Sequence, residues 1–303
     1  MMLFPSVLLL GNGLNLACGG RSWSGLIDDI NVRTDIPSFK ESLLPMPMQA
    51  ILATNNNIKD AMKCKHSEFM GRFAAVEQGE LMRSLLSLGF KDILTTNYSY
   101  EMEIAAHRRC EMTTREIQRL ARCTEGRVEA QYLLHSYNEV EYEGRVSRIW
   151  HIHGESRKPN SMILGHYWYA SQLARMKELV DSRENRYLQA QKEEKAFACT
   201  SWLDSFLLGD VYVLGFGYNI AEIDLWWLLN RKKREKAQTG KLYFYEPASA
   251  KEYEKVELLR LMGAEIIDLG YCLDEKNKDE TNRIYARFYQ DAISDMIDRL
   301  SRK

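Results

Sequence analysis

Short runs of consecutive large apolar residues recur along this chain, and most of them end in glycine or in polar residues. An unbroken apolar run this short is typical of a strand buried on both faces, as in a parallel sheet. Between the runs, apolar residues recur at three- and four-residue spacing, which predicts amphipathic helices. The predicted strands lie at residues 7–10, 90–98, 146–154, 210–214, 242–245 and 264–268, and the predicted helices include 58–88, 253–261 and 285–300.

Strands that alternate with helices indicate an α/β fold. We therefore expect a doubly wound, Rossmann-like parallel sheet with helical insertions at about residues 31–90, 100–140 and 167–208. No repeat, low-complexity tract or linker divides the sequence, so residues 1–303 are expected to form a single domain.

The first apolar run leads directly into the turn Gly11-Asn12-Gly13. Glycines at this place let the backbone turn sharply and approach a ligand without a Cβ in the way. A helix beginning near Leu14 would direct its free N–H groups and its dipole at that ligand, which favours a phosphate. Leu16 stands where a dinucleotide-binding fingerprint has its third glycine, so an ordinary tight turn is the alternative.

A second strand with a glycine turn follows later in the chain, where the apolar run 210–214 continues into Gly215 and Gly217. Asn219 and Glu222 have the spacing of a capping box, which predicts that a helix begins there. The two glycine turns therefore share one local architecture of strand, turn and helix.

Polar side chains stand at the carboxyl ends of two further predicted strands, where open α/β sheets bind ligands. Thr96 and Asn97 end the second strand, and His153 ends the third, immediately before Gly154. This position is expected to expose the imidazole of His153 to a cleft. His151 and His153 could be metal ligands on one face of the strand, but no carboxylate or cysteine stands at a useful spacing. We therefore expect no metal, and a structural role for His151.

Composition narrows the classes of function and location. A formal net charge of −1 argues against a protein that coats nucleic acid or anionic membrane. The six cysteines form no Cys-x-x-Cys pair, which is typical of a reducing compartment and excludes the common zinc-ribbon spacing. No apolar run approaches the ~18 residues of a membrane span. A soluble, cytoplasmic protein is expected.

The glycine turns and the polar strand ends together resemble the sirtuin-like superfamily in their order and approximate spacing. The similarity is closer to the bacterial sirtuin-like proteins of antiphage defence than to protein deacylases, and it covers the sheet core rather than the helical insertions. The matching motifs are Gly11-Asn12-Gly13 with Ser22-Trp23, Thr95-Thr96-Asn97-Tyr98, His151-Ile152-His153-Gly154, and Gly215-Phe216-Gly217.

The resemblance implies a role for each matching residue. Gly11, Asn12 and Gly13 would meet the pyrophosphate of NAD, and Thr96 would lie in the same NAD site. Asn97 matches the asparagine at the ribose and nicotinamide site, and His153 matches the histidine that acts as the base. The glycines of the second turn, Gly215 and Gly217, would approach the adenosine half.

The resemblance thus implies an NAD glycohydrolase with NAD as its substrate, and His153→Ala is expected to lose most activity without losing the fold. Two departures keep alternatives open. Ser99 stands where the family often has an acidic residue, which leaves room for a nucleotide-binding regulatory subunit of a defence complex with little catalysis. The four-cysteine zinc module of sirtuin deacylases is missing, which makes deacylation the weakest of the three hypotheses.

Uncontrolled hydrolysis of NAD would kill the host cell. We therefore expect gating by homo-oligomerisation or by an activating sensor subunit that detects infection, because no sensor domain is recognisable in this chain. Direct binding to nucleic acid or membrane is not expected.

Overall fold

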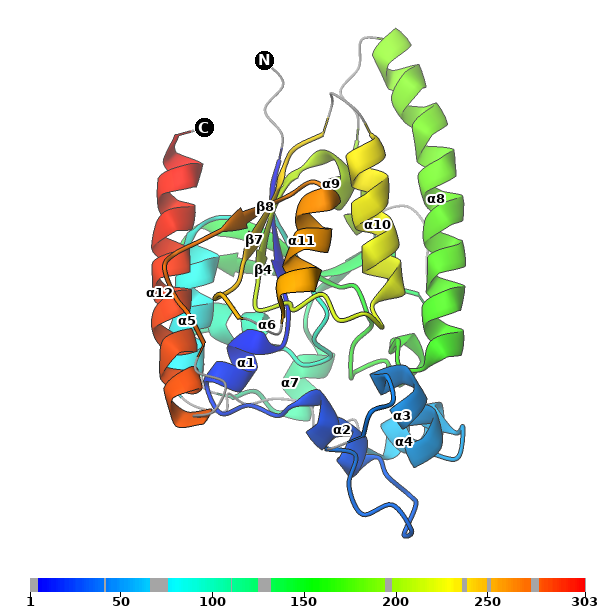
Figure 1. Cartoon of the computed structure of the whole chain (residues 1–303). Helices are drawn as coiled ribbons and strands as arrows, with labels where there is room; N and C mark the ends of the chain where they lie inside the picture. The colour runs from blue at the N-terminus through cyan, green and yellow to red at the C-terminus, as the bar shows by residue number, and fades with distance from the viewer. Residues whose placement is uncertain are drawn as a thin grey trace.

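The computed structural model describes residues 5–40, 42–65, 76–109, 111–124, 132–193, 198–235, 239–249, 252–273 and 278–302. Its strands are β1 (Ser6–Leu10), β2 (Asp92–Thr95), β3 (Arg122–Thr124), β4 (Ser136–Tyr142), β5 (Arg145–His151), β6 (Asp210–Leu214), β7 (Leu242–Tyr245) and β8 (Ala264–Ile267). They form one eight-stranded sheet in the order β3-β4-β5-β2-β1-β6-β7-β8 (Figure 1). All six predicted strands are present, and the α/β fold is confirmed.

The strand order reverses at the centre of the sheet. β1 pairs in parallel with β2 on one side and with β6 on the other. β5 lies parallel beyond β2, whereas β7 and β8 lie parallel beyond β6. In open α/β sheets, ligands bind outside the carboxyl ends of the strands at such a reversal. The turns that follow β1 and β6 therefore occupy the expected ligand position.

One edge of the sheet differs from the prediction. β3 and β4 are antiparallel, so the sheet is mixed, and they lie in the region predicted as a helical insertion at 100–140. That region also holds two short helices, α6 (Glu101–Ala106) and α7 (Thr114–Gln118). The turn from β4 to β5, Glu143-Gly144, has positive φ at both residues, as a type I′ hairpin requires.

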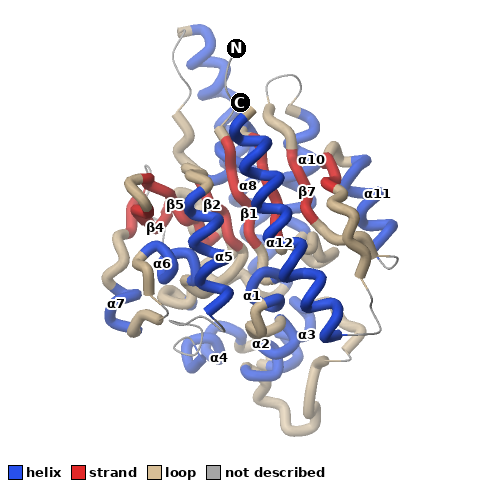
Figure 2. Tube along the Cα trace, turned by 90° about the vertical axis from the view of Figure 1, so that its left-hand side faces the viewer, coloured by secondary structure: helices blue, strands red, loops and turns tan. Residues whose placement is uncertain are grey.

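Helices cover both faces of the sheet, so the fold is doubly wound (Figures 1 and 2). In β1, Leu8 and Leu10 pack on one face, and Val7 and Leu9 pack on the other. The first face is covered by α1 (Gly13–Ala17), α5 (Val76–Ser87), α6 and α12 (Lys278–Ser301). The second is covered by α8 (His166–Lys192), α9 (Trp202–Leu208), α10 (Ile223–Arg234) and α11 (Tyr253–Leu261). The predicted helices at 167–208 and 253–261 are thus confirmed.

A third group of helices lies beyond the carboxyl ends of the strands, at the bottom of Figure 1. It comprises α2 (Trp23–Asp29), α3 (Met46–Ala53) and α4 (Ile58–Lys65). Their apolar side chains, among them Ile27 and Met62, pack against Tyr98 and Leu164 from the loops that follow β2 and β5. This layer therefore encloses the edge where the candidate site lies. The helix predicted at 58–88 is present as α4 and α5, and its residues 66–75 lie outside the described ranges.

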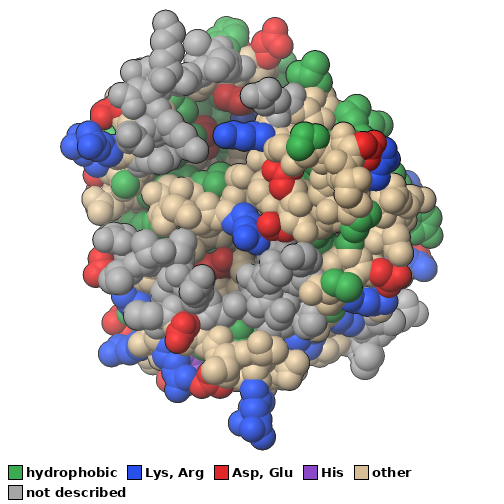
Figure 3. All heavy atoms as spheres, turned by 90° about the horizontal axis from the view of Figure 1, so that it is seen from below, with side chains coloured by type: hydrophobic (Ala, Val, Ile, Leu, Met, Phe, Trp, Pro, Cys, Tyr) green, Lys and Arg blue, Asp and Glu red, His purple; other side chains and the backbone are tan. Residues whose placement is uncertain are grey.

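Charged side chains of both signs are interspersed over the described part of this end of the molecule (Figure 3). None of the described helices is long and apolar enough to cross a membrane.

Candidate functional site

The two glycine turns predicted from the sequence lie against each other. Gly11 N–H donates to the carbonyl of Leu214 (3.2 Å), and Gly13 N–H donates to the carbonyl of Gly215 (2.8 Å). A Cβ added at Gly11 would stand 2.5 Å from the Gly215 oxygen, and one at Gly13 would stand 2.7 Å from it. Gly215 has φ of +65°, a conformation that favours glycine. These three glycines are therefore required by the contact between the turns, whatever else they bind.

The other two predicted cofactor-binding residues in these turns, Asn12 and Gly217, are placed differently. Asn12 uses its amide nitrogen on the Arg21 carbonyl (2.8 Å), and its oxygen accepts from Asn15 (3.1 Å), so its side chain holds its own loop together. Gly217 has open space around it, because a Cβ there would come no closer than 4.0 Å to another group, the Lys255 ammonium. A ligand could approach the backbone at Gly217 without steric conflict.

Asn97 joins the first glycine turn, as predicted. Its side-chain amide reaches the Gly11 carbonyl (3.5 Å), and the preceding residue, Thr96, donates its N–H to the Leu10 carbonyl (3.2 Å). The Asn97 carbonyl contacts Nδ1 of His151 (2.9 Å). The structural role expected for His151 is evident here, because it holds the loop that carries Asn97.

Asn97 also lines a small pocket with Ser99, Glu101 and Glu103. The Ser99 hydroxyl donates to the Glu101 carboxylate, so the acidic group absent at position 99 is present two residues later. Glu103 is buried and accepts from His151 Nε2 (3.0 Å) through Oε1, whereas its Oε2 has no hydrogen-bond partner among the described residues. The pocket thus offers hydrogen-bond acceptors beside the candidate ribose-binding asparagine.

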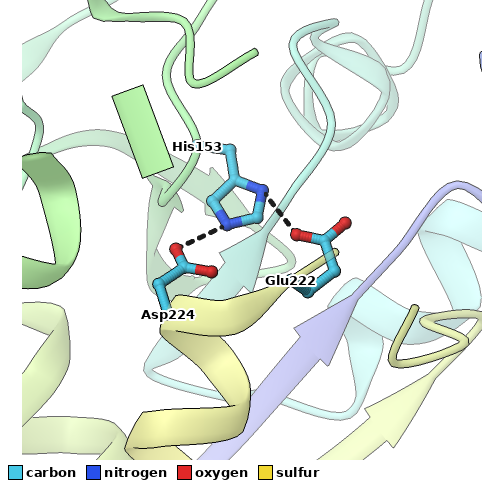
Figure 4. A group of neighbouring side chains, drawn as sticks. All are labelled: His153, Glu222 and Asp224. Carbon is cyan, nitrogen blue, oxygen red and sulfur yellow. Dashed lines mark hydrogen bonds and ion pairs between the residues drawn. The ribbon is translucent and has the colours of Figure 1, made fainter. Parts of the chain in front are cut away.

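His153 lies in a second cluster, and its expected exposure to a cleft is wrong. The side chain is completely buried, with Nε2 3.0 Å from Asp224 Oδ2 and Nδ1 3.6 Å from Glu222 Oε2 (Figure 4). The backbone turns away from the strand at Gly154 (φ +91°), and Ile163 N–H then donates to the His153 carbonyl (2.7 Å). The returning segment therefore covers the position that the sequence places at an open strand end.

The two carboxylates are held by side chains from α8. Tyr169 donates its hydroxyl to Glu222 (3.0 Å), and Gln172 donates its amide to Asp224 (2.8 Å). The contacts of His153 are thus with α8 and with the start of α10, whereas Asn97 faces the first glycine turn. The structure places both predicted catalytic residues at one end of the sheet but in separate clusters.

Glu222 also corrects the predicted capping box. Helix α10 begins at Ile223 with Glu222 as its N-cap residue, and no side chain caps it. Asn219 instead accepts from Ala221 N–H (3.0 Å) in a local turn. The Glu222 side chain points to His153, because this buried imidazole provides the positive partner that a buried carboxylate needs.

Burial and charge act in opposite directions on the imidazole. Burial lowers the pKa of His153, but Asp224 and Glu222 raise it more, so the pKa lies above its usual value. The pKa of Glu222 is raised to about 7, because burial and the nearby Asp224 together outweigh the opposing effects of His153 and of the hydrogen bond from Tyr169. The cluster therefore holds at least one proton near neutral pH, and His153 is less available as a base than a free imidazole.

His153, Glu222 and Asp224 are also the group of side chains, among those described, whose ligand atoms lie close enough to hold a metal. The two carboxylates face opposite nitrogens of the ring, however, and Nε2 is hydrogen-bonded to Asp224. This is the geometry of a hydrogen-bonded triad, because ligands of one ion converge on a point. His151 pairs with Glu103 of α6, on the opposite face of the sheet from α8 and α10, so the two histidines cannot be ligands of the same metal ion.

The cluster of His153, Glu222 and Asp224 should make the stability of the protein depend on pH, and Glu222→Gln should weaken that dependence. A folded-state pKa above the unfolded value favours the protonated form, so stability from both His153 and Glu222 is greatest at low pH and is lost as pH rises through the raised values. Glutamine does not titrate, so the variant lacks the part of the pH-dependent stability that comes from Glu222. We expect the loss of unfolding free energy between about pH 5 and about pH 8 to be smaller in the variant by about 1–3 kcal/mol.

Urea denaturation at both pH values measures this difference. Glu178→Gln, on the exposed surface of α8, is the control and should lose as much stability as the wild type. An unchanged pH dependence in Glu222→Gln would contradict the protonation scheme.

The carboxylates of Glu222 and Asp224 are the members of the candidate site that sequence reasoning missed. One signal was present: the two acidic residues interrupt an otherwise apolar segment, residues 220–229, a few positions after a glycine turn at a strand end. Comparison with known proteins adds no relative, because no protein-family model and no curated protein matches this chain.

Proposed function

We propose that this protein is an NAD glycohydrolase, which cleaves NAD to nicotinamide and ADP-ribose. The observation that carries the proposal is the meeting of Gly11, Gly215 and Asn97 at the carboxyl edge, where the strand order reverses. Ligands of open α/β sheets bind at this position. The resemblance to sirtuin-like proteins then favours NAD among the nucleotides that such an edge can accept.

The chemistry requires few groups. Nicotinamide is a cationic leaving group, and its departure leaves an oxocarbenium-like carbon on the ribose. Asn97 would hold the ribose, and His153 would act as the base that activates water or a ribose hydroxyl. His153 is enclosed in this structure, so contact with substrate requires the surrounding side chains, Tyr98, Tyr169 and Gln172, to move aside.

This enclosure supports the proposal that activity is gated. A partner subunit or self-association that opens the layer around His153 would switch on the hydrolysis of NAD, as expected of an antiphage defence protein. The isolated monomer should then turn over NAD slowly.

The burial of His153 also favours a second candidate function. A nucleotide-binding subunit with little catalysis needs the glycine turns and Asn97 but no accessible base. Calorimetric binding of NAD without release of nicotinamide, by the protein alone and with candidate partners, would support this function instead.

The direct test is nicotinamide release from NAD, followed by chromatography, at low and high protein concentration. We expect wild-type turnover to exceed that of Asn97→Ala by about 10²-fold or more, as for other positioned polar groups in active sites. Asn160→Ala, at an exposed position, is the matched control and should retain wild-type turnover. Equal turnover by Asn97→Ala and the wild type would remove Asn97 from the site.

A further inference from the structure

Each ring nitrogen of His153 faces a carboxylate, and both carboxylates come from one short segment. Asp224 Oδ2 lies 3.0 Å from Nε2, which is a hydrogen bond, whereas Glu222 Oε2 lies 3.6 Å from Nδ1, which is too long for one. Nδ1 accordingly has no hydrogen-bond partner among the described residues, although the side chain is completely buried. Nε2 is thus engaged in a hydrogen bond, whereas Nδ1 is not.

Asp224 is itself held rigidly. Its Oδ1 accepts from Leu225 N–H (2.9 Å), and its Oδ2 accepts from Gln172 (2.8 Å) as well as from His153. The same Gln172 amide donates to the carbonyl of Ile152 (3.1 Å), directly before His153. This ring of contacts joins the carboxylate, the imidazole and the strand end, and it holds Asp224 against Nε2.

We propose that Asp224 is the positioning residue of His153: by accepting the Nε2–H it makes Nδ1 the nitrogen that takes up and releases the working proton. The role as a base rests on the proposed function, whereas the assignment of the proton does not. A carboxylate that accepts from one ring nitrogen fixes the tautomer and leaves the other nitrogen to react. Glu222 Oε2 lies 3.6 Å from that nitrogen and can share a proton with it.

The titration of His153 depends on all the ionisable groups around it. Glu222 and Asp224 come from the start of α10, Tyr98 from the loop after β2, and Tyr169 from α8. Tyr218, in the second glycine turn, faces Asp224. The tyrosines are neutral at ordinary pH because their pKa values are raised by burial, so the two carboxylates control the charge of the imidazole.

Nuclear magnetic resonance of the ring nitrogens tests the assignment without any assay of activity. In the intact protein, His153 is identified among the six histidines by the signal that is missing from His153→Gln. We expect Nε2 to keep its proton throughout and Nδ1 to lose its proton as pH rises. Asp224→Asn should lower the midpoint of this titration by about 1–3 pH units, and Asp181→Asn, exposed on α8, should leave it unchanged.

A wild-type His153 that keeps its proton on Nδ1 and loses it from Nε2 would overturn the proposal, and so would an unchanged titration in Asp224→Asn. If Asp224→Asn does not fold, the wild type and Glu222→Gln decide, because Glu222→Gln should retain the proton on Nε2.

Kinetics then test the positioning role. Asp224→Asn should lower kcat by about 10²-fold or more and leave KM within about threefold of the wild type, because a positioning residue acts through His153 and not by binding the substrate. The acidic limb of its pH profile should move to lower pH. If no condition yields hydrolysis of NAD, the proposed function fails while the resonance experiment still decides the role of Asp224.

Discussion

Asp92→Ala is expected to lower the free energy of unfolding by about 3–5 kcal/mol. Asp92 begins β2 and is buried at 2% exposure. Arg148 binds both carboxylate oxygens, at 2.7 and 2.8 Å, Trp150 donates its indole N–H (2.9 Å), and Ser205 donates its hydroxyl (2.8 Å). Alanine would remove the carboxylate on which the mostly buried Arg148 guanidinium, the Trp150 indole N–H and the Ser205 hydroxyl converge.

Urea denaturation followed by circular dichroism measures this loss. Asp181→Ala, in an exposed ion pair with Lys177 on α8, is the matched control and should stay within about 0.5 kcal/mol of the wild type. A change below about 1 kcal/mol in Asp92→Ala would show that water or neighbouring groups replace the carboxylate.

The central strands were predictable because each is buried on both faces. β1 and β6 are continuous apolar runs whose residues alternate between the two layers of helices, so the run itself identifies the strand. β4 was not predictable in this way. Its outer residues Glu139 and Glu141 are exposed, and its polar composition resembles that of a surface helix. The Glu143-Gly144 turn was the local signal of a hairpin.

The parts of the candidate site that lie at strand ends could be predicted from the sequence. The parts that depend on how helices and loops pack over those strand ends could not. The contact of Gly11, Gly215 and Asn97 follows from three parallel strands ending at one edge. The burial of His153 does not follow from the strand order. It results from the segment after Gly154 and from α8, which pack over the strand end. The pairing with Asp224 joins residues 71 positions apart and has no local signal.

His153→Gln is expected to lower nicotinamide release by about 10²–10⁴-fold, the contribution typical of a positioned general base. Glutamine is the informative replacement because its amide can still donate to Asp224 at the position of Nε2. It has no group that accepts and releases a proton near neutral pH. The loss should therefore appear in kcat, under whichever condition activates the wild type, with the fold intact by circular dichroism.

His153→Ala was expected from the sequence to lose activity and keep its fold, and the buried triad changes the second part of that expectation. Removing the imidazole leaves Glu222 and Asp224, both buried, without their positive partner. Breaking a buried ion pair in this way costs about 3–5 kcal/mol, so low activity in the alanine variant would not separate a lost base from a lost fold. Comparison of the two variants does separate them. Wild-type turnover in a folded His153→Gln protein would exclude His153 as the base, and the triad would then be a structural element beneath the site that Asn97 lines.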